Sequence, residues 1–98
     1  MAATRRGNRA EPELDPPTNV ISHIELMSLF QKKGVIELIV VEFAPGLYRI
    51  EATIAWRIGR WTLTGARGPR QFRTLDNLAK HLKTMGLGRT VTRLELLS

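Results

Sequence analysis

The chain has 98 residues and a net charge of +6, and its length suits one domain with a thin hydrophobic core. It contains no cysteine, which excludes disulfides, thiolate nucleophiles and cysteine-ligated zinc. The longest apolar run is far shorter than a membrane span, and the first residues lack the apolar segment of a signal peptide. We therefore expect a cytoplasmic protein without a membrane partner.

Positive charge is concentrated in the second half of the chain. Residues 1–46 carry five basic and six acidic side chains, whereas residues 47–98 carry ten basic and three acidic ones. A cationic domain favours an anionic partner such as nucleic acid, because neutralising phosphates releases counterions. Charge alone does not separate DNA from RNA.

The first 19 residues combine arginines with acidic side chains and with Pro12, Pro16 and Pro17, and they show no apolar periodicity. This composition predicts a disordered tail over residues 1–19. Residues 20–98 are then expected to form a single α+β domain.

The stretch that follows the tail is ambiguous. Ile24, Met27 and Phe30 have the spacing of a helix that ends at Gly34, although part of the stretch also fits a strand. We favour the helix.

Residues 35–43 predict a strand that ends at the turn 44–46, Ala-Pro-Gly. Apolar side chains fall on both faces of this strand, so each face needs a cover. We expect a later helix on one face and either the first helix or a second subunit on the other.

A hairpin is expected next. Every even position from 48 to 58 is apolar, which is the period of a half-buried strand, and Gly59-Arg60 resembles a two-residue turn. This turn would set Trp56 opposite Leu63 and place Trp56 and Trp61 in the core, rather than on the surface as stacking platforms for single strands.

A capped helix follows the hairpin. Thr74 is the expected N-cap, Asp76 suits the first turn, and Gly86 suits the left-handed position after the last turn. Residues 87–98 then predict a short strand, which either joins the sheet beside the first strand or exchanges with a partner chain. The apolar stripe of this helix comprises Leu75, Leu78, Ala79, Leu82 and Met85.

These elements predict an α+β fold in the order α-β-β-β-α-β. The expected sheet has three to four antiparallel strands, with the C-terminal helix packed on one of its faces.

The clearest candidate site is an arginine-rich loop that leads into the N-terminus of this helix, where free backbone N–H groups also attract anions. Further arginines lie along the hairpin and at its far end, on a polar sheet face that includes Glu51. A ribbon with such a face has the right width for a DNA major groove. The alternative is that these arginines serve solubility or pair with Glu51 and Asp76. The candidate nucleic-acid-binding residues are Arg49, Arg57, Arg60, Arg67, Arg70 and Arg73.

Signatures of an enzyme are lacking in the sequence. There is no phosphate-binding glycine pattern and no nucleophile flanked by a base, and His23 and His81 alone do not form a metal-binding set. We expect neither catalysis nor a cofactor, metal or small-molecule substrate.

Residues 59–86 read G-x-W-T-L-T-x-A-R-G-x-R-x-F-R-T-L-D-N-L-A-x-x-L-x-x-x-G, with variable positions written as x. This run resembles short proteins of proteobacterial plasmids and integrative elements that are loosely labelled replication or partition accessory proteins. The resemblance implies a unit of three strands and a helix that serves plasmid maintenance or its regulation. The β-β-β-α order also resembles the arm-site DNA-binding domains of tyrosine recombinases, in which the sheet enters the major groove.

We therefore expect a homodimeric DNA-binding accessory or regulatory protein of a plasmid or mobile element. The alternative is a protein-interaction module in which the two-faced strand 35–43 recruits another chain.

Overall fold

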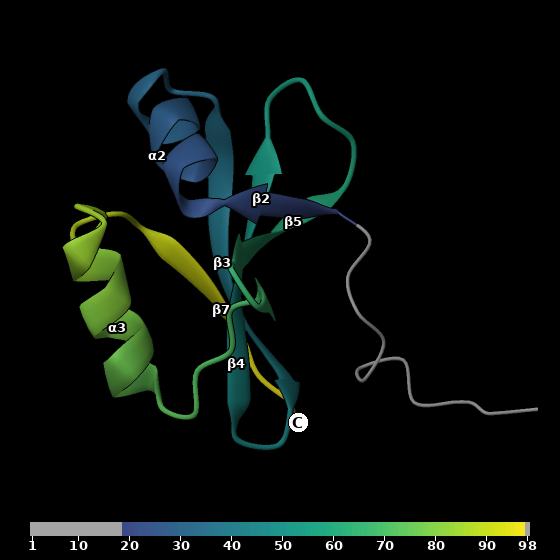
Figure 1. Cartoon of the computed structure of the whole chain (residues 1–98), viewed down its shortest axis with the longest axis vertical. Helices are drawn as coiled ribbons and strands as arrows, with labels where there is room; N and C mark the ends of the chain where they lie inside the picture. The colour runs from purple at the N-terminus through teal and green to yellow at the C-terminus, as the bar shows by residue number, and fades with distance from the viewer. Residues whose placement is uncertain (1–18, 98) are drawn as a thin grey trace, which may run out of the picture.

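A six-stranded mixed sheet carries both helices on one of its faces (Figure 1). The computed structural model describes residues 19–97, so the tail expected over residues 1–19 lies, except for its last residue, outside the described part. No helix within residues 19–97 is long and apolar enough to cross a bilayer. The elements are β2 (Val20–Ser22), α2 (His23–Gln31), β3 (Val35–Ala44), β4 (Leu47–Ile54), β5 (Arg60–Gly65), β6 (Gly68–Pro69), α3 (Leu75–Thr84) and β7 (Thr92–Glu95).

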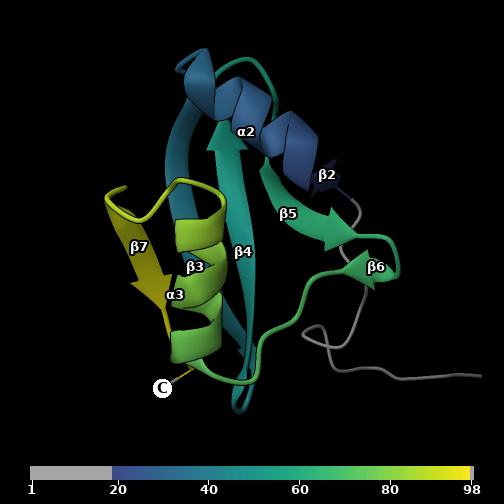
Figure 2. The same ribbon diagram turned by 60° about the vertical axis from the view of Figure 1, so that its left-hand side comes forward.

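The α+β class is confirmed, but the purely antiparallel sheet is wrong. The strand order is β2-β5-β4-β3-β7, and the short β6 also pairs with β5 (Figure 2). Two of the pairings, β2 with β5 and β3 with β7, are parallel. The helix α2 is a crossover that returns the chain from β2 into β3 in the same direction, and β5 and β7 also run in that direction. Within residues 19–97 the element order also begins with a strand rather than with a helix.

Local signals placed several boundaries correctly. Ser22 accepts a hydrogen bond from the backbone of the first turn of α2, so the helical interpretation of this stretch is confirmed. Thr74 caps α3 in the same way, and Gly86 adopts a φ of +80° after the last turn. The turn between β3 and β4 is Pro45-Gly46, with Gly46 at a φ of +72°.

The hairpin turn at Gly59-Arg60 is wrong. In the structure Arg60 is the first residue of β5, and Ala52 rather than Ile58 lies opposite Trp61. A five-residue loop, 55–59, connects the strands. The pairing is displaced by an even number of residues, so the apolar faces of the two strands still coincide.

The loop keeps Trp56 out of the core, contrary to expectation. Trp56 is 63% exposed and Ile58 is 96% exposed, whereas Trp61 is half-buried against the core. The strand stops at Ile54 because the chain turns there, and the N–H of Arg57 donates to the carbonyl of Ile54 at 3.2 Å. A β-carbon at position 34 would lie 2.6 Å from the ring of Trp56, so this glycine makes room for the indole.

The core lies between the helices and the sheet. Three of the expected stripe residues of α3, Leu78, Leu82 and Met85, are buried, whereas Leu75 and Ala79 are not. Leu26 and Leu29 of α2 join the same cluster. Both helices therefore cover one face of the sheet. The opposite face is covered by charged side chains instead.

Candidate nucleic-acid interface

The face of the sheet opposite the helices is crossed by a network of ion pairs. Glu51 on β4 accepts from Arg49 at 2.8 Å and from Arg60 at 3.2 Å. Arg60 also forms two hydrogen bonds with Glu95 on β7, at 2.7 and 2.8 Å. We call these residues, together with Arg93 and Glu37 on the same face, the sheet-face network. It contains three arginines and three glutamates, so its formal charge is zero.

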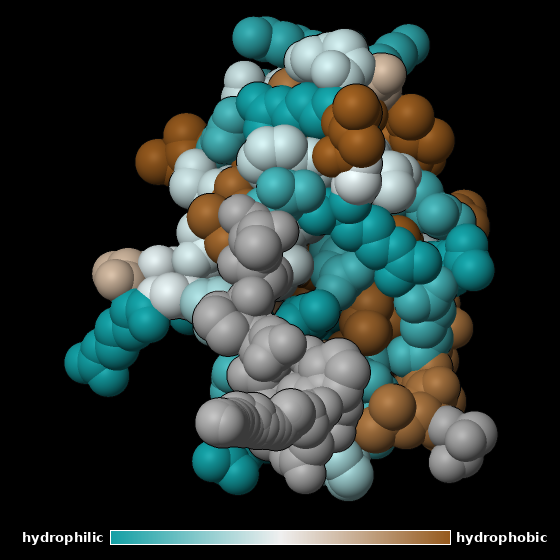
Figure 3. All heavy atoms as spheres, turned by 90° about the vertical axis from the view of Figure 1, so that its right-hand side faces the viewer, coloured by the Kyte–Doolittle hydropathy of each residue, from teal (hydrophilic) through white to brown (hydrophobic). Residues whose placement is uncertain are grey.

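The network helps to bury apolar surface. Glu51 on β4 lies directly opposite Ile39 on β3. Because Arg60 stands on β5 and Glu95 on β7, their two-bond contact spans the two strands between them. The aliphatic stem of a long arginine can cover apolar neighbours in this way. Ile39 is 0% exposed and Glu51 is 5% exposed, and Figure 3 shows hydrophilic side chains across the middle of this face.

The contact between Arg60 and Glu95 also shifts the pKa of both groups. Its hydrogen bonds raise the pKa of Arg60 above its ordinary range and lower the pKa of the Glu95 carboxyl. Both groups are therefore charged throughout the physiological range, and the pair persists over it.

Arg57 is engaged elsewhere. Its guanidinium donates to Glu25 of α2 at 2.6 Å and lies 4.8 Å from the centre of the Trp61 ring. The Trp61 indole N–H in turn donates to the carbonyl of Ile58 at 3.3 Å. These contacts fold the loop 55–59 back against α2. Among the six expected site residues, Arg49, Arg57 and Arg60 thus have carboxylate partners.

The other three, Arg67, Arg70 and Arg73, belong to a different surface. All three are exposed, and within residues 19–97 none of them forms an ion pair. Lys80 and Lys83 on α3 are exposed as well. We call these five residues the cationic strip. Residues 67–89, which contain it, have six basic side chains and one acidic side chain.

Two adjoining depressions connect members of the strip. One, of about 470 Å³, is lined by the turn and strand that carry Arg67 and Arg70. The other, of about 510 Å³, lies against α3 and is lined by Arg70, Arg73 and Lys80. Arg70 and Gln71 line both depressions. Volumes of this size hold small ligands or parts of larger ones, and the lining of both is cationic or neutral.

His81 lies at the inner wall of the second depression. A guanidinium nitrogen of Arg70 is 3.5 Å from its Nδ1, and the His81 ring also contacts Phe72 and His23. Burial lowers the pKa of His81 below its ordinary 6.5, and the neighbouring Arg70 and His23 lower it further. At neutral pH this histidine is uncharged, so the charge of the depression comes from its arginines and lysine.

Sequence reasoning missed the outward face of α3. Asn77, Lys80 and Thr84 line the second depression together. Their spacing of three and four residues puts them on one side of the helix, away from the buried Leu78 and Leu82. This polar spacing was the signal that could have identified them.

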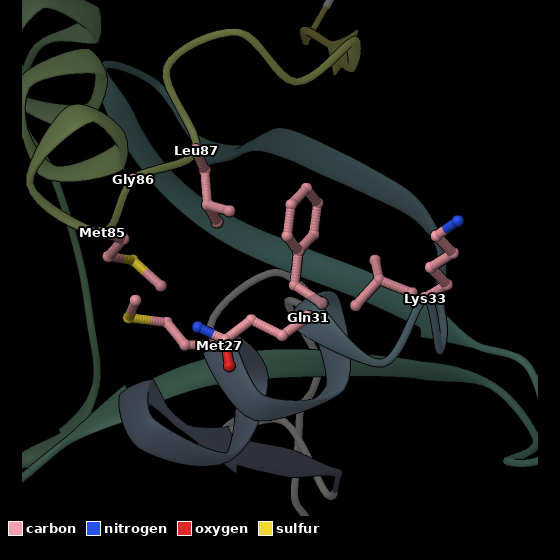
Figure 4. Close-up of a pocket in the computed structure, with 8 residues that line it drawn as sticks. Met27, Gln31, Lys33, Met85, Gly86 and Leu87 are labelled. Carbon is pink, nitrogen blue, oxygen red and sulfur yellow. The ribbon is translucent and has the colours of Figure 1, made fainter.

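An apolar groove of about 610 Å³ lies between α2 and the end of α3. Figure 4 shows the side chains of Met27 and Met85 close together at one end, and the amine of Lys33 at the other. Its walls also include Phe30, Val35 and Leu87. Within residues 19–97 no three histidine or acidic side chains are arranged to hold a metal. The groove thus offers apolar contacts but no pair of groups for acid–base chemistry.

Comparison of the chain with protein-family models, with curated proteins and with solved structures gave no match.

Proposed function

We propose that the protein binds duplex DNA through the cationic strip, with α3 facing the major groove and the arginines of the preceding loop on phosphates. The observation that carries this proposal is the separation of charge. Four of the ten basic residues in 47–98, namely Arg49, Arg57, Arg60 and Arg93, have carboxylate partners. The remaining six all lie within residues 67–89.

The dimensions of α3 support this mode of binding. Its ten residues form a rod about 15 Å long. An α-helix with its side chains is about 10–12 Å in diameter, and this diameter fits a major groove about 12 Å wide. Asparagine and lysine side chains on its outward face are suited to base edges and to phosphates, respectively. Guanidinium groups at Arg70 and Arg73 can grip phosphate oxygens with two hydrogen bonds each. The sheet face, by contrast, has no net charge to offer.

The proposal describes a binding protein and not an enzyme. Within the strip region the hydroxyl of Thr84 donates to the carbonyl of Lys80, and that of Thr74 caps α3. Neither hydroxyl is paired with a general base. In keeping with the resemblance of residues 59–86, we place this DNA binding in the maintenance or regulation of a plasmid or mobile element.

The test is a fluorescence-anisotropy titration of the full chain with a labelled duplex of about 20 base pairs, at salt concentrations from about 50 to 200 mM. The variant Arg70→Ala/Arg73→Ala should bind about 10- to 100-fold more weakly at low salt and lower the slope of log K against log salt by about two. The control Lys32→Ala/Lys33→Ala removes the same charge from exposed residues after α2 and should change both quantities little.

Three outcomes would contradict the proposal: no duplex binding at low salt, binding that is indifferent to salt, or equal losses in the two double variants. Double-stranded RNA and single-stranded DNA of the same sequence are run in parallel. Because a helix cannot read the deep, narrow major groove of A-form RNA, duplex DNA should bind most tightly of the three.

A further inference from the structure

The strand β7 forms one edge of the sheet and is poorly protected. It pairs with β3 on one side, and among residues 19–97 no strand pairs with its other side. Such an edge presents unpaired N–H and C=O groups, and proteins usually blunt it with proline, lysine or a bulge. β7 is a four-residue strand that carries Arg93 and Glu95, but it has no proline, lysine or bulge. The opposite edge differs, because it is formed by the very short strands β2 and β6.

Apolar side chains cluster along this unprotected edge. Val91 is 93% exposed, Leu94 50%, Leu96 56% and Leu97 46%. An exposed row of this kind on a sheet edge is a site for pairing with another strand. It is distinct from β3, the strand expected to recruit a partner, whose residues Leu38 and Ile39 are buried within one chain.

The sequence of β7 is complementary to itself. In an antiparallel pair of two β7 strands with Leu94 opposite Leu94, each Arg93 lies opposite Glu95 of the second copy. Thr92 then lies opposite the second copy's Leu96, and Val91 opposite the second copy's Leu97. Arg93 and Glu95 sit on the same face of the sheet, since their β3 neighbours are Ile39 and Val41. Opposite charges directly across a strand pair stabilise it.

Charge also selects this register over its neighbours. A shift by one pair in either direction that keeps the faces aligned sets Arg93 against Arg93, or Glu95 against Glu95. Like charges directly opposite one another destabilise a sheet. Within one chain Glu95 already accepts from Arg60 and lies 3.1 Å from Arg93. A carboxylate accepts several hydrogen bonds and a guanidinium donates several, so these contacts leave room for further ones across the pair.

We propose that β7 pairs with β7 of a second copy, antiparallel about Leu94, to form a two-fold symmetric dimer with one continuous sheet. Both pairs of helices then lie on the same side of that sheet. The proposal stands on the edge and its charge pattern, and it does not depend on whether the protein binds nucleic acid.

The test is the mass of the full chain by size-exclusion chromatography with light scattering. The wild type should have twice the chain mass of 11.1 kDa, with a Kd of about 10 µM or tighter. Leu94→Lys, which places like charges on the two-fold axis, should give folded monomers whose melting temperature no longer depends on protein concentration, because Leu94 is half exposed.

The decisive experiment uses two charge reversals. Arg93→Glu and Glu95→Arg should each be monomeric, because each strand then repels its own copy. An equimolar mixture should form a heterodimer, because every altered pair becomes complementary again. Circular-dichroism melts verify that both variants are folded, since Glu95→Arg also removes a partner of Arg60.

The proposal is overturned if the wild type is monomeric at a chain concentration of about 100 µM, which is ten times the expected Kd. It is also overturned by a dimer that survives Leu94→Lys, or by folded variants whose mixture stays monomeric.

Discussion

The sheet-face network and the cationic strip are both rich in arginine, yet they differ in the residues that surround the arginines. On the sheet face each arginine lies beside a glutamate from the same or another strand, and the charges cancel. In the strip the arginines project from a turn and a loop, where no strand neighbour brings a carboxylate. The first region closes a face of the sheet, and the second presents net charge to solvent.

This contrast explains why counting arginines along a sequence does not locate a binding surface. Arg49 and Arg60 sit on a polar strand face like those that read DNA, but Glu51 between them is buried beneath their guanidinium groups. Surface ion pairs stabilise little individually. Their larger effect here is on binding. Arg49, Arg57 and Arg60, three of the six candidate residues, already pair with carboxylates and so offer less charge to a phosphate.

The largest expected effect comes from Glu51→Ala. Removing one partner of a buried pair typically costs several kcal/mol, and because Arg49 and Arg60 are partly exposed we expect a loss of about 2 kcal/mol in the free energy of unfolding. Urea denaturation measures it. Asp76→Ala is the matched control, because it removes the same charge from an exposed position in the first turn of α3 and should cost about 0.5 kcal/mol.

The same pair of variants separates the two regions by their binding. Asp76→Ala removes the one acidic residue beside the cationic strip and should raise the affinity for duplex DNA about threefold to tenfold. Glu51→Ala should raise it less, although it releases two arginines. A larger gain for Glu51→Ala would mean that the sheet face, and not α3, meets the DNA.

A smaller effect distinguishes the residues of α3 from one another. Lys80→Ala should weaken binding to all duplexes by about threefold and reduce the salt slope by about one, because a phosphate contact is lost. Asn77→Ala should leave the salt slope unchanged and reduce the differences between duplex sequences, because amides read base edges. Anisotropy titrations against a small set of sequences measure both. If neither variant differed from the wild type, α3 would not lie in the groove.

Local chemistry made part of this architecture predictable. The caps at Thr74 and Gly86 and the turn at Pro45-Gly46 depend on residues a few positions apart, and the structure has them where the sequence indicated. The parallel pairings of β2 and β7 depend on crossovers, and nothing in the short strands themselves encodes their direction.

The error in the hairpin has a specific cause. The alternating pattern continues through Trp56 and Ile58, past the real end of β4 at Ile54, so periodicity alone extends the strand too far. The loop that follows the strand is held against α2 by an ion pair between Arg57 and Glu25, which are 32 residues apart in sequence. Contacts over such distances leave no periodic signal.

The candidate site was predictable in the same uneven way. Arg67, Arg70 and Arg73 lie within one short stretch of the chain, spaced by three, and the sequence indicates them directly. The pairing of Arg60 with Glu95 joins residues 35 positions apart and requires the sheet order to be known. Lys80, by contrast, could have been added from helical spacing alone.

The smallest expected effect is a pH dependence at His81, the only histidine lining the second depression of the strip. Its pKa is lower in the folded chain than its ordinary 6.5. The unfolded chain therefore binds a proton first, so the stability contributed by this group is present above pH 6.5 and is lost as pH falls through the lower, folded pKa. The Glu95 carboxyl, whose pKa is depressed from 4.5, stabilises the fold above pH 4.5, and this contribution is lost only at more acidic pH.

Bound phosphate should reverse the preference of His81. An anion beside Arg70 and His81 favours the protonated ring, so the affinity for duplex DNA should rise as pH falls from 7.5 to 5.5 while the melting temperature of the unbound chain falls. The variant His81→Gln should flatten both trends. His23→Gln, which removes a neighbour that lowers the pKa of His81, should shift both trends to higher pH without abolishing them. If His81→Gln kept the wild-type dependence of affinity on pH, the phosphate would not lie against α3. The cationic strip would then end at the loop.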